Sequence, residues 1–364
     1  MPEKPVDECA RAEFPRDAPP EEQLRFLIGY AIMAPSSHNT QPWIWEVAGN
    51  QVGLYADRSR LMPALDPEGR ELIISCGAAL EHLRLAMHAF GCQESIALFP
   101  DPKTPDLLAR VDLLKNSNST QSQAENKLPD EQALFDEIAL RHTNRKIFDA
   151  KPLPEVLLLS LQAEAHAMGA WLHFLQGAGE RESVSSLIAM GEEIQAGKSG
   201  IRHDLARWMS PNDDTRRDGI PGYAQGISDN ASHVASFWTH IFGPNASLAE
   251  KNSLLAENAP VLVVLGAAED GPIQWLAAGR ALARVLLRAS AAGVSASFFS
   301  QPIQVHVLWS ELRRTLGCSD FPQLIFRLGY PQEATPATPR RAVEEVTTPD
   351  IAARLDADMN QRGF

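Results

Sequence analysis

The chain has 364 residues, of which 44% are apolar, and a formal net charge of −13. This length allows one large domain or two ordinary ones around a substantial core, and no apolar run is long enough to span a bilayer. The charge argues against a nucleic-acid-binding or membrane-surface protein, which needs clustered Lys and Arg, and the four scattered cysteines form no metal motif.

Residues 1–19 mix charges with prolines and should form an irregular arm; they show no secretory signal, so we expect a cytoplasmic protein. A first helix should begin at Pro20, because a proline followed by two acids suits a helix start. Leu24, Leu27 and Ile28 continue it as an apolar stripe. After Pro35 ends this helix, residues 43–47 and 52–55 should form a hairpin.

A helix predicted from about Gly77 to Ala89 has a partner far downstream. Residues 77–91 align without gaps on residues 279–293, and both segments end in a Gly that suits a left-handed helix cap. The pair Pro20-Glu21 likewise recurs as Pro154-Glu155, where another apolar stripe begins. The chain therefore divides into two related halves, 20–128 and 129–364, and the polar low-complexity stretch 115–127 lies at their junction.

The second half contains two apolar segments, 261–265 and 324–328, that are typical of central strands. Helices and strands together predict an α+β protein, with two mixed sheets flanked by helices. From about residue 197 to 245, turn-forming residues alternate with large aromatic ones. This insertion is either a lid or a plain surface excursion.

Two polar segments carry the candidate chemistry. Residues 34–43 offer hydroxyls and amides that suit a polyol or a flavin edge, although an ordinary helix stop explains such a turn equally well. Within residues 141–145, two arginines and a threonine can converge on a phosphate, although the spacing alone favours a solvated helix end. His38 is more typical of a structural hydrogen-bonding residue than of a catalytic one. The sequence has neither a P-loop nor a dinucleotide fingerprint.

These segments together resemble the nitroreductase superfamily, and within it the Acg-like FMN-binding oxidoreductases. Residues 34–43 resemble the signature Ala-Pro-Ser-x-x-Asn-x-Gln-Pro-Trp. Residues 141–148 resemble the phosphate signature Arg-x-Ser-x-Arg/Lys-x-Phe, with Thr for Ser and one extra residue before Phe. Leu328-Gly329-Tyr330-Pro331 and the later pair Arg340-Arg341 resemble the end of the family's sequences.

The resemblance implies non-covalent FMN, reduced by NAD(P)H, and a small acceptor such as a nitroaromatic or a quinone. It implies no catalytic side chain and no metal, because the flavin performs the hydride chemistry. Two alternatives stay open: a catalytically silent protein that stores or sequesters FMN beneath a lid, and a flavin dehydrogenase or dehalogenase of a particular metabolite. The residues that the resemblance places at FMN are Pro35, Ser36, Ser37, Asn39, Arg141, Thr143, Arg145, Ser297, Ser300, Gln301, Arg340 and Arg341.

The resemblance also predicts the number of sites. In an ordinary nitroreductase homodimer, each site combines the phosphate signature of one subunit with the turn of the other. In this chain, residues 14–19 lack the phosphate signature and residues 167–171 lack the turn. One complete FMN site would therefore form between the halves, in a monomer that imitates a dimer rather than in a homodimer.

Overall fold

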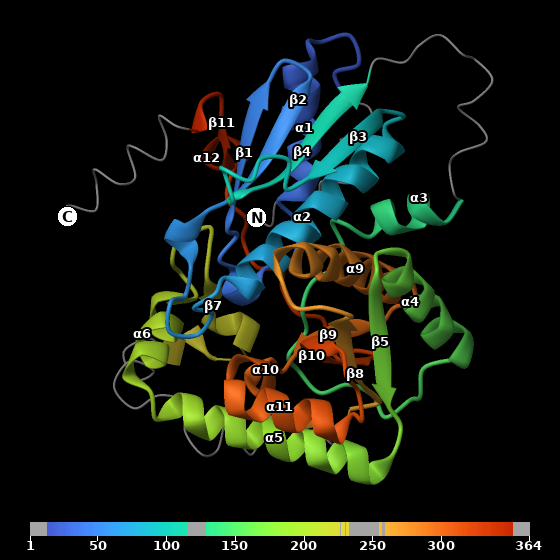
Figure 1. Cartoon of the computed structure of the whole chain (residues 1–364), viewed down its shortest axis with the longest axis vertical. Coiled ribbons are helices and arrows are strands. Elements are labelled where there is room, and N and C mark those ends of the chain that lie inside the picture. Colours follow the sequence, from blue (N-terminus) through green and yellow to red (C-terminus); the bar gives the residue numbers. More distant parts are fainter. Residues whose placement is uncertain are drawn as a thin grey trace.

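The computed structural model of the chain describes residues 13–114, 129–225, 227–229, 231–232, 255–256 and 259–351. Two sheets lie on opposite sides of a central pair of long helices, α2 (Arg70–Ala89) and α9 (Pro272–Ala291) (Figure 1). The predicted α+β class, with sheets flanked by helices, is confirmed, but only the first sheet is mixed, because every strand pair of the second is antiparallel. Within the described ranges, no helix has the length and apolar character needed to cross a membrane.

The first sheet has the strand order β11-β1-β2-β4-β3. Its strands β1 (Trp43–Ala48) and β2 (Gln51–Ala56) form the predicted hairpin, and β3 (Gln93–Leu98) and β4 (Leu107–Leu114) extend it. Helix α1 (Pro20–Ala31) begins at the expected proline. The short edge strand β11 (Thr347–Thr348), which follows α12 (Val343–Val346), pairs in parallel with β1. The end of the described chain therefore belongs to the sheet of the first half.

The second sheet has the order β5-β8-β10-β9, with β5 (Ala170–Leu175), β8 (Val261–Ala267), β9 (Ser295–Phe298) and β10 (Phe321–Gly329). The predicted central positions of β8 and β10 are confirmed. Val261, Val263 and Leu265 belong to the main core, whereas Leu262 and Val264 belong to a second apolar cluster, as the alternation of side chains along a strand requires.

Helices cover both faces of the second sheet. On the side of the main core lie α9 and α4 (Glu155–Ala167), which begins directly after Pro154 as predicted. On the other side lie α5 (Ala178–Ala196), α10 (Gln301–Gln304) and α11 (His306–Thr315). Figure 1 shows α5 and α11 on the side of this sheet that faces away from the first one. Helix α3 (Pro129–Asp136) packs beside α2 and α9.

The two central helices make a reciprocal contact at the aligned glycines. A Cβ on Gly77 would lie 2.2 Å from the carbonyl oxygen of Leu276, and a Cβ on Gly279 would lie 1.9 Å from that of Ile74. Ile74 and Leu276 stand in equivalent positions, because each precedes its glycine by one helical turn. Each helix thus meets the other as two copies meet across a two-fold axis.

Helix α2 begins at Arg70, so the predicted start near Gly77 is wrong. The β-branched pair Ile73-Ile74 weakens the local signal for a helix. Burial outweighs this preference, because all but four of the 20 residues of α2 are buried. The predicted left-handed caps are confirmed at Gly91, with φ of 78°, and at Gly293, with φ of 72°.

A buried ion network also joins the helices. Glu81 on α2 is fully buried and accepts hydrogen bonds from Arg84 on its own helix and from Arg280 and Arg284 on α9. Burial alone would raise the pKa of Glu81, but these guanidiniums hold it below its ordinary value. Arg284 also binds Glu164 on α4 at 2.6 Å. The network fixes how the elements that carry the site sit relative to one another.

Candidate functional site

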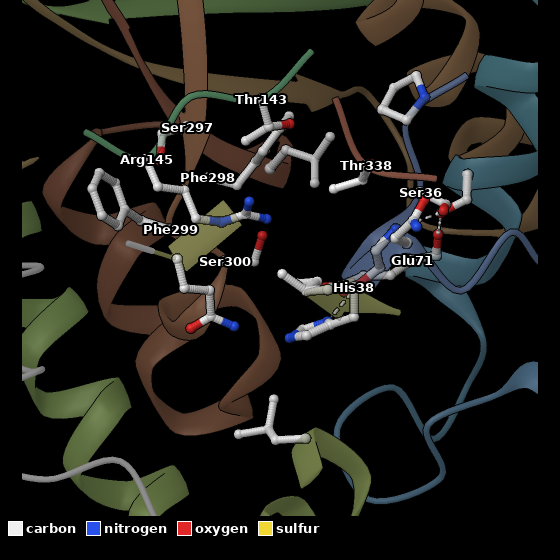
Figure 2. Close-up of a pocket in the computed structure, with 18 of the residues that line it drawn as sticks. Ser36, His38, Glu71, Thr143, Arg145, Ser297, Phe298, Phe299, Ser300 and Thr338 are labelled. Atoms are coloured by element: carbon white, nitrogen blue, oxygen red, sulfur yellow. Dashed lines mark hydrogen bonds between the residues drawn. The ribbon is translucent and has the colours of Figure 1, made fainter. Parts of the chain in front are cut away.

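A cavity of about 340 Å³ is lined by residues on both sides of the predicted junction. Its walls come from the turn at residues 35–39, from α2, from the loop 141–145, from the segment 297–304, from the insertion and from residues 336–340. Figure 2 shows Arg145 and His38 reaching into this cavity from opposite sides. The site therefore combines segments of both predicted halves.

The turn at residues 35–39 is held by its own polar side chains and by α2. Ser36 Oγ accepts a hydrogen bond from the main-chain N–H of Gln41 at 3.0 Å, and Ser75 Oγ on α2 accepts one from that of Ser37 at 3.1 Å. His38 and Asn39 adopt left-handed conformations, with φ of 50° and 54°. Such backbone is uncommon outside glycine and costs energy, so the surrounding contacts must maintain it.

The loop 141–145 lies along the edge strand of the second sheet. Thr143 forms an isolated parallel bridge with Ala296 in β9, and the main-chain N–H of Asn144 donates to the carbonyl oxygen of Ala296 at 3.0 Å. This pairing brings Arg141, Thr143 and Arg145 to the cavity beside Ser297, the next residue of β9.

Three arginines in the cavity wall have no balancing carboxylate within the described ranges. Arg141, Arg145 and Arg340 form no ion pair with any of the described residues, and Nε of Arg141 and of Arg340 is buried without a hydrogen-bond partner. Burial lowers the pKa of Arg141 to about 9, and the nearby Arg340 adds to this effect. Burial also lowers the pKa of Arg145 and of Arg340 to about 10. Buried cations of this kind are costly without an anion, so the cluster suits an anionic ligand.

Eleven of the twelve residues predicted for the cofactor line the cavity; Arg341 does not. The guanidinium of Arg341 donates instead to the carbonyl oxygens of Gln41, at 3.1 Å, and Glu345, at 2.8 Å. The amide of Asn39 is already engaged within the protein: it accepts from Arg340 and donates to the carbonyl oxygens of Gly219 and Pro339. The eleven residues that line the cavity are Pro35, Ser36, Ser37, Asn39, Arg141, Thr143, Arg145, Ser297, Ser300, Gln301 and Arg340.

A polar wall made by α2, α5 and α10 contains only one predicted residue, Gln301. Gln304 donates to Glu71 Oε1 at 2.7 Å and accepts from Gln195 at 2.7 Å. Gln301 donates to Glu192 at 2.6 Å. A signal was present, because residues 192 and 195, like 301 and 304, stand one helical turn apart and so share one face of a helix.

The insertion contributes to the cavity through α6 (Ser199–Arg207), β6 (Met209–Ser210), β7 (Ile220–Pro221) and η3 (Gly222–Gln225). Residues 205, 209, 220 and 225 line the cavity; most of residues 226–245 lie outside the described ranges. Asp204 ties α6 to the first half, because its Oδ2 accepts from the main-chain N–H groups of Ala64 at 2.8 Å and Leu65 at 3.1 Å.

Asp204→Ala should loosen this attachment. Asp204 is only 4% exposed, so its loss leaves two amides without their acceptor, at a cost of about 1–3 kcal/mol. Hydrogen exchange followed by mass spectrometry should show faster exchange across residues 199–225 than in the unsubstituted protein. Asp214→Ala is the control, because Asp214 is exposed on the same insertion. Equal exchange in the two variants would contradict a docking role for Asp204.

Comparisons with known proteins identify relatives of similar length, although no family model matches the chain. Two relatives from Mycobacterium tuberculosis H37Rv carry the name "Putative NAD(P)H nitroreductase". Rv3131 is 28% identical over 348 residues, which cover 94% of this chain and 95% of the relative. The protein named acg is 26% identical over 326 residues, with coverages of 89% and 94%. A third, "Uncharacterized protein Rv3127" of the same organism, is 30% identical over 352 residues, with coverages of 93% and 97%.

The solved structures that resemble this chain are less similar to it in sequence than these relatives are. One of them is an FMN- and NADPH-dependent nitroreductase, NfnB of a Sphigopyxis strain, which is 19% identical to this chain. The match covers 58% of this chain and 96% of the NfnB chain, with a TM-score of 0.38.

Proposed function

Because the chain belongs to the nitroreductase superfamily, with Acg-like relatives over nearly its whole length, we propose that it is an FMN-dependent NAD(P)H oxidoreductase. In this proposal, one FMN occupies the cavity between the halves, and a small acceptor such as a nitroaromatic or a quinone takes the electrons.

One observation carries the proposal, namely the cluster of Arg141, Arg145 and Arg340, which has no carboxylate partner in the part of the chain that the structure describes. The phosphate of FMN is a dianion with several acceptor oxygens, and guanidinium groups match it in geometry and charge. The hydroxyl of Thr143 stands between the first two arginines in sequence and adds a further donor at the cavity. An anion bound there would offset the cost of withdrawing three cations, the buried Arg141 and the half-buried Arg145 and Arg340, from solvent.

The rest of the cavity fits the rest of FMN. The hydroxyls of Ser36 and Ser297 suit a polyol, and apolar side chains such as Ile74 and Leu282 suit the faces of a flat ring. When bound, the flavin supplies hydride transfer between a nicotinamide and an acceptor. The protein's own residues would bind and orient the cofactor and restrict access of water.

We further propose that the chain is an internal duplication with a single flavin site. Support comes from α2 and α9, which have equal lengths, align without gaps and meet reciprocally at Gly77 and Gly279. It also comes from the cavity, because Pro35–Asn39 reach it from the first half and Arg141–Arg145 from the second. On this basis we expect a monomer that imitates a dimer. Binding of two FMN equivalents per chain would contradict the proposal.

The test is anaerobic stopped-flow mixing of FMN-loaded protein with NADH and, separately, with NADPH. Bleaching of the flavin absorbance by either nucleotide, with reoxidation by a quinone or a nitroaromatic compound, would support an oxidoreductase. Bleaching by dithionite alone, with neither nucleotide effective, would contradict it.

Bleaching by dithionite alone would favour the alternative that the protein sequesters FMN. One observation motivates this alternative: the insertion both lines the cavity, through residues 205, 209 and 220, and binds the first half through Asp204. An insertion that stays bound over the cavity would hinder a nicotinamide from stacking on the flavin.

A further inference from the structure

A hydrogen-bonded chain runs from Glu71 on α2, through Ser37, to His38, whose ring reaches the cavity (Figure 2). Ser37 Oγ lies 2.5 Å from Glu71 Oε2 and 3.1 Å from His38 Nδ1. The other carboxylate oxygen of Glu71 accepts from Gln304 at 2.7 Å, and the residue is only 4% exposed. The carboxylate is therefore held in place on both sides.

This bonding pattern assigns the proton on His38. A carboxylate only accepts hydrogen bonds, so the single hydroxyl proton of Ser37 goes to Glu71. Ser37 Oγ must then accept from His38, which places a proton on Nδ1. Nε2 is left as the ring atom that can exchange a proton with a molecule in the cavity.

We propose that His38 is a catalytic acid, which donates a proton from Nε2 to the oxygen of an electron acceptor, while Ser37 and Glu71 are positioning residues. The inference rests on the proposed function and narrows the acceptor to quinones and nitro compounds, whose oxygens gain protons as they gain electrons. For a quinone, the bound flavin would supply a hydride, that is, two electrons and one proton. The Nε2–H bond of the imidazolium then breaks, an O–H bond of the hydroquinone forms, and solvent reprotonates the imidazole.

The charges around His38 set the sign of the pH dependence. Burial is the largest influence and lowers its pKa below 6.5; Glu71 on α2 raises it, and Arg145 on the opposite wall lowers it. The imidazolium is therefore a minority form at neutral pH, and its fraction grows as the pH falls toward this lowered pKa. Quinone reduction should accelerate as the pH falls through this range.

The test uses His38→Gln in the FMN-loaded protein, reduced anaerobically with dithionite and mixed with one of two acceptors. Benzoquinone needs protons, whereas ferricyanide takes electrons without them. We expect reoxidation by benzoquinone to slow by about 100-fold or more and to lose its acceleration at low pH, because a positioned acid contributes about 10²–10⁴-fold. Reoxidation by ferricyanide should not change. His173→Gln is the control, because His173 lies on β5, outside the cavity, and pairs with Glu180.

Several outcomes would overturn the inference. Equal slowing with both acceptors would indicate altered access or altered flavin potential rather than a lost acid. An unchanged benzoquinone rate, or an unsubstituted protein that benzoquinone does not reoxidise, would also refute it. Nitrogen-15 spectra of histidine-labelled protein, assigned with His38→Gln, give a readout that needs no turnover, and an Nε2–H tautomer at neutral pH would contradict the chain. Failure of the proposed function can be distinguished from failure of the proposed role of His38. It would be seen as absent FMN or as no reduction of the flavin by either nucleotide.

Discussion

Arg141→Ala should yield a protein that loses its FMN during purification. The guanidinium of Arg141 is buried and pairs with no carboxylate among the described residues, so its strongest partner would be the FMN phosphate. Removing a buried partner of a charged group costs about 2–4 kcal/mol. This loss corresponds to a dissociation constant for FMN that is roughly 30- to 700-fold larger. The ratio of flavin to protein absorbance, followed by a fluorescence titration of the flavin-free protein, measures the loss.

A structural role for Arg141 predicts something different. If the arginine serves only the fold, the flavin-free variant should unfold more readily than the flavin-free unsubstituted protein. If it serves the ligand, the flavin-free variant should be at least as stable, because an unbalanced buried cation has been removed. His38→Ala is the comparison within the cavity, and we expect it to retain FMN. A fully loaded Arg141→Ala protein would contradict the phosphate assignment.

The parts of the fold that the sequence predicts well depend on local patterns. The start of α1, the hairpin of β1 and β2, and the strands β8 and β10 follow from apolar periodicity and from turn residues. The first turns of α2 were missed, because Ile73 and Ile74 prefer strands locally and are held in a helix by burial between the two sheets. The edge strand β11 was also missed, since its partner β1 is about three hundred residues away.

The candidate site likewise contains residues that short motifs predict and residues that only tertiary contacts reveal. Short motifs identified the cavity residues of the turn 35–39 and of the loop 141–145. Arg341 differs from Arg340 because its guanidinium donates to the carbonyl oxygens of Gln41 and Glu345 and does not line the cavity. Glu71 could not be paired with Gln304 from the sequence, because 233 positions separate them. The orientation of His38 likewise depends on Ser37 and Glu71 together, and only the tertiary structure brings these contacts into view.

Gly279→Ala should strongly destabilise the protein, although alanine is the better helix former. The added Cβ would lie 1.9 Å from the carbonyl oxygen of Ile74 and 2.9 Å from the Cα of Gly77, and both are backbone atoms of a buried helix. The helices must therefore separate, and overpacking of this kind costs about 3 kcal/mol or more when backbone has to move. The midpoint of urea denaturation, followed by circular dichroism, should fall accordingly.

Gly179→Ala provides the matched control, because Gly179 lies in α5 and a Cβ there would meet nothing within 4 Å. It should be neutral or stabilising by up to about 1 kcal/mol, the ordinary gain of alanine over glycine in a helix. Gly77→Ala should reproduce the loss seen at Gly279, and the double variant should lose less than the sum, because the first methyl already parts the helices. FMN should bind more weakly in each of these central variants, since Ile74 on α2 and Leu282 on α9 both line the cavity. Full stability and full loading of Gly279→Ala would refute the contact between the helices, and strictly additive losses would refute its reciprocity.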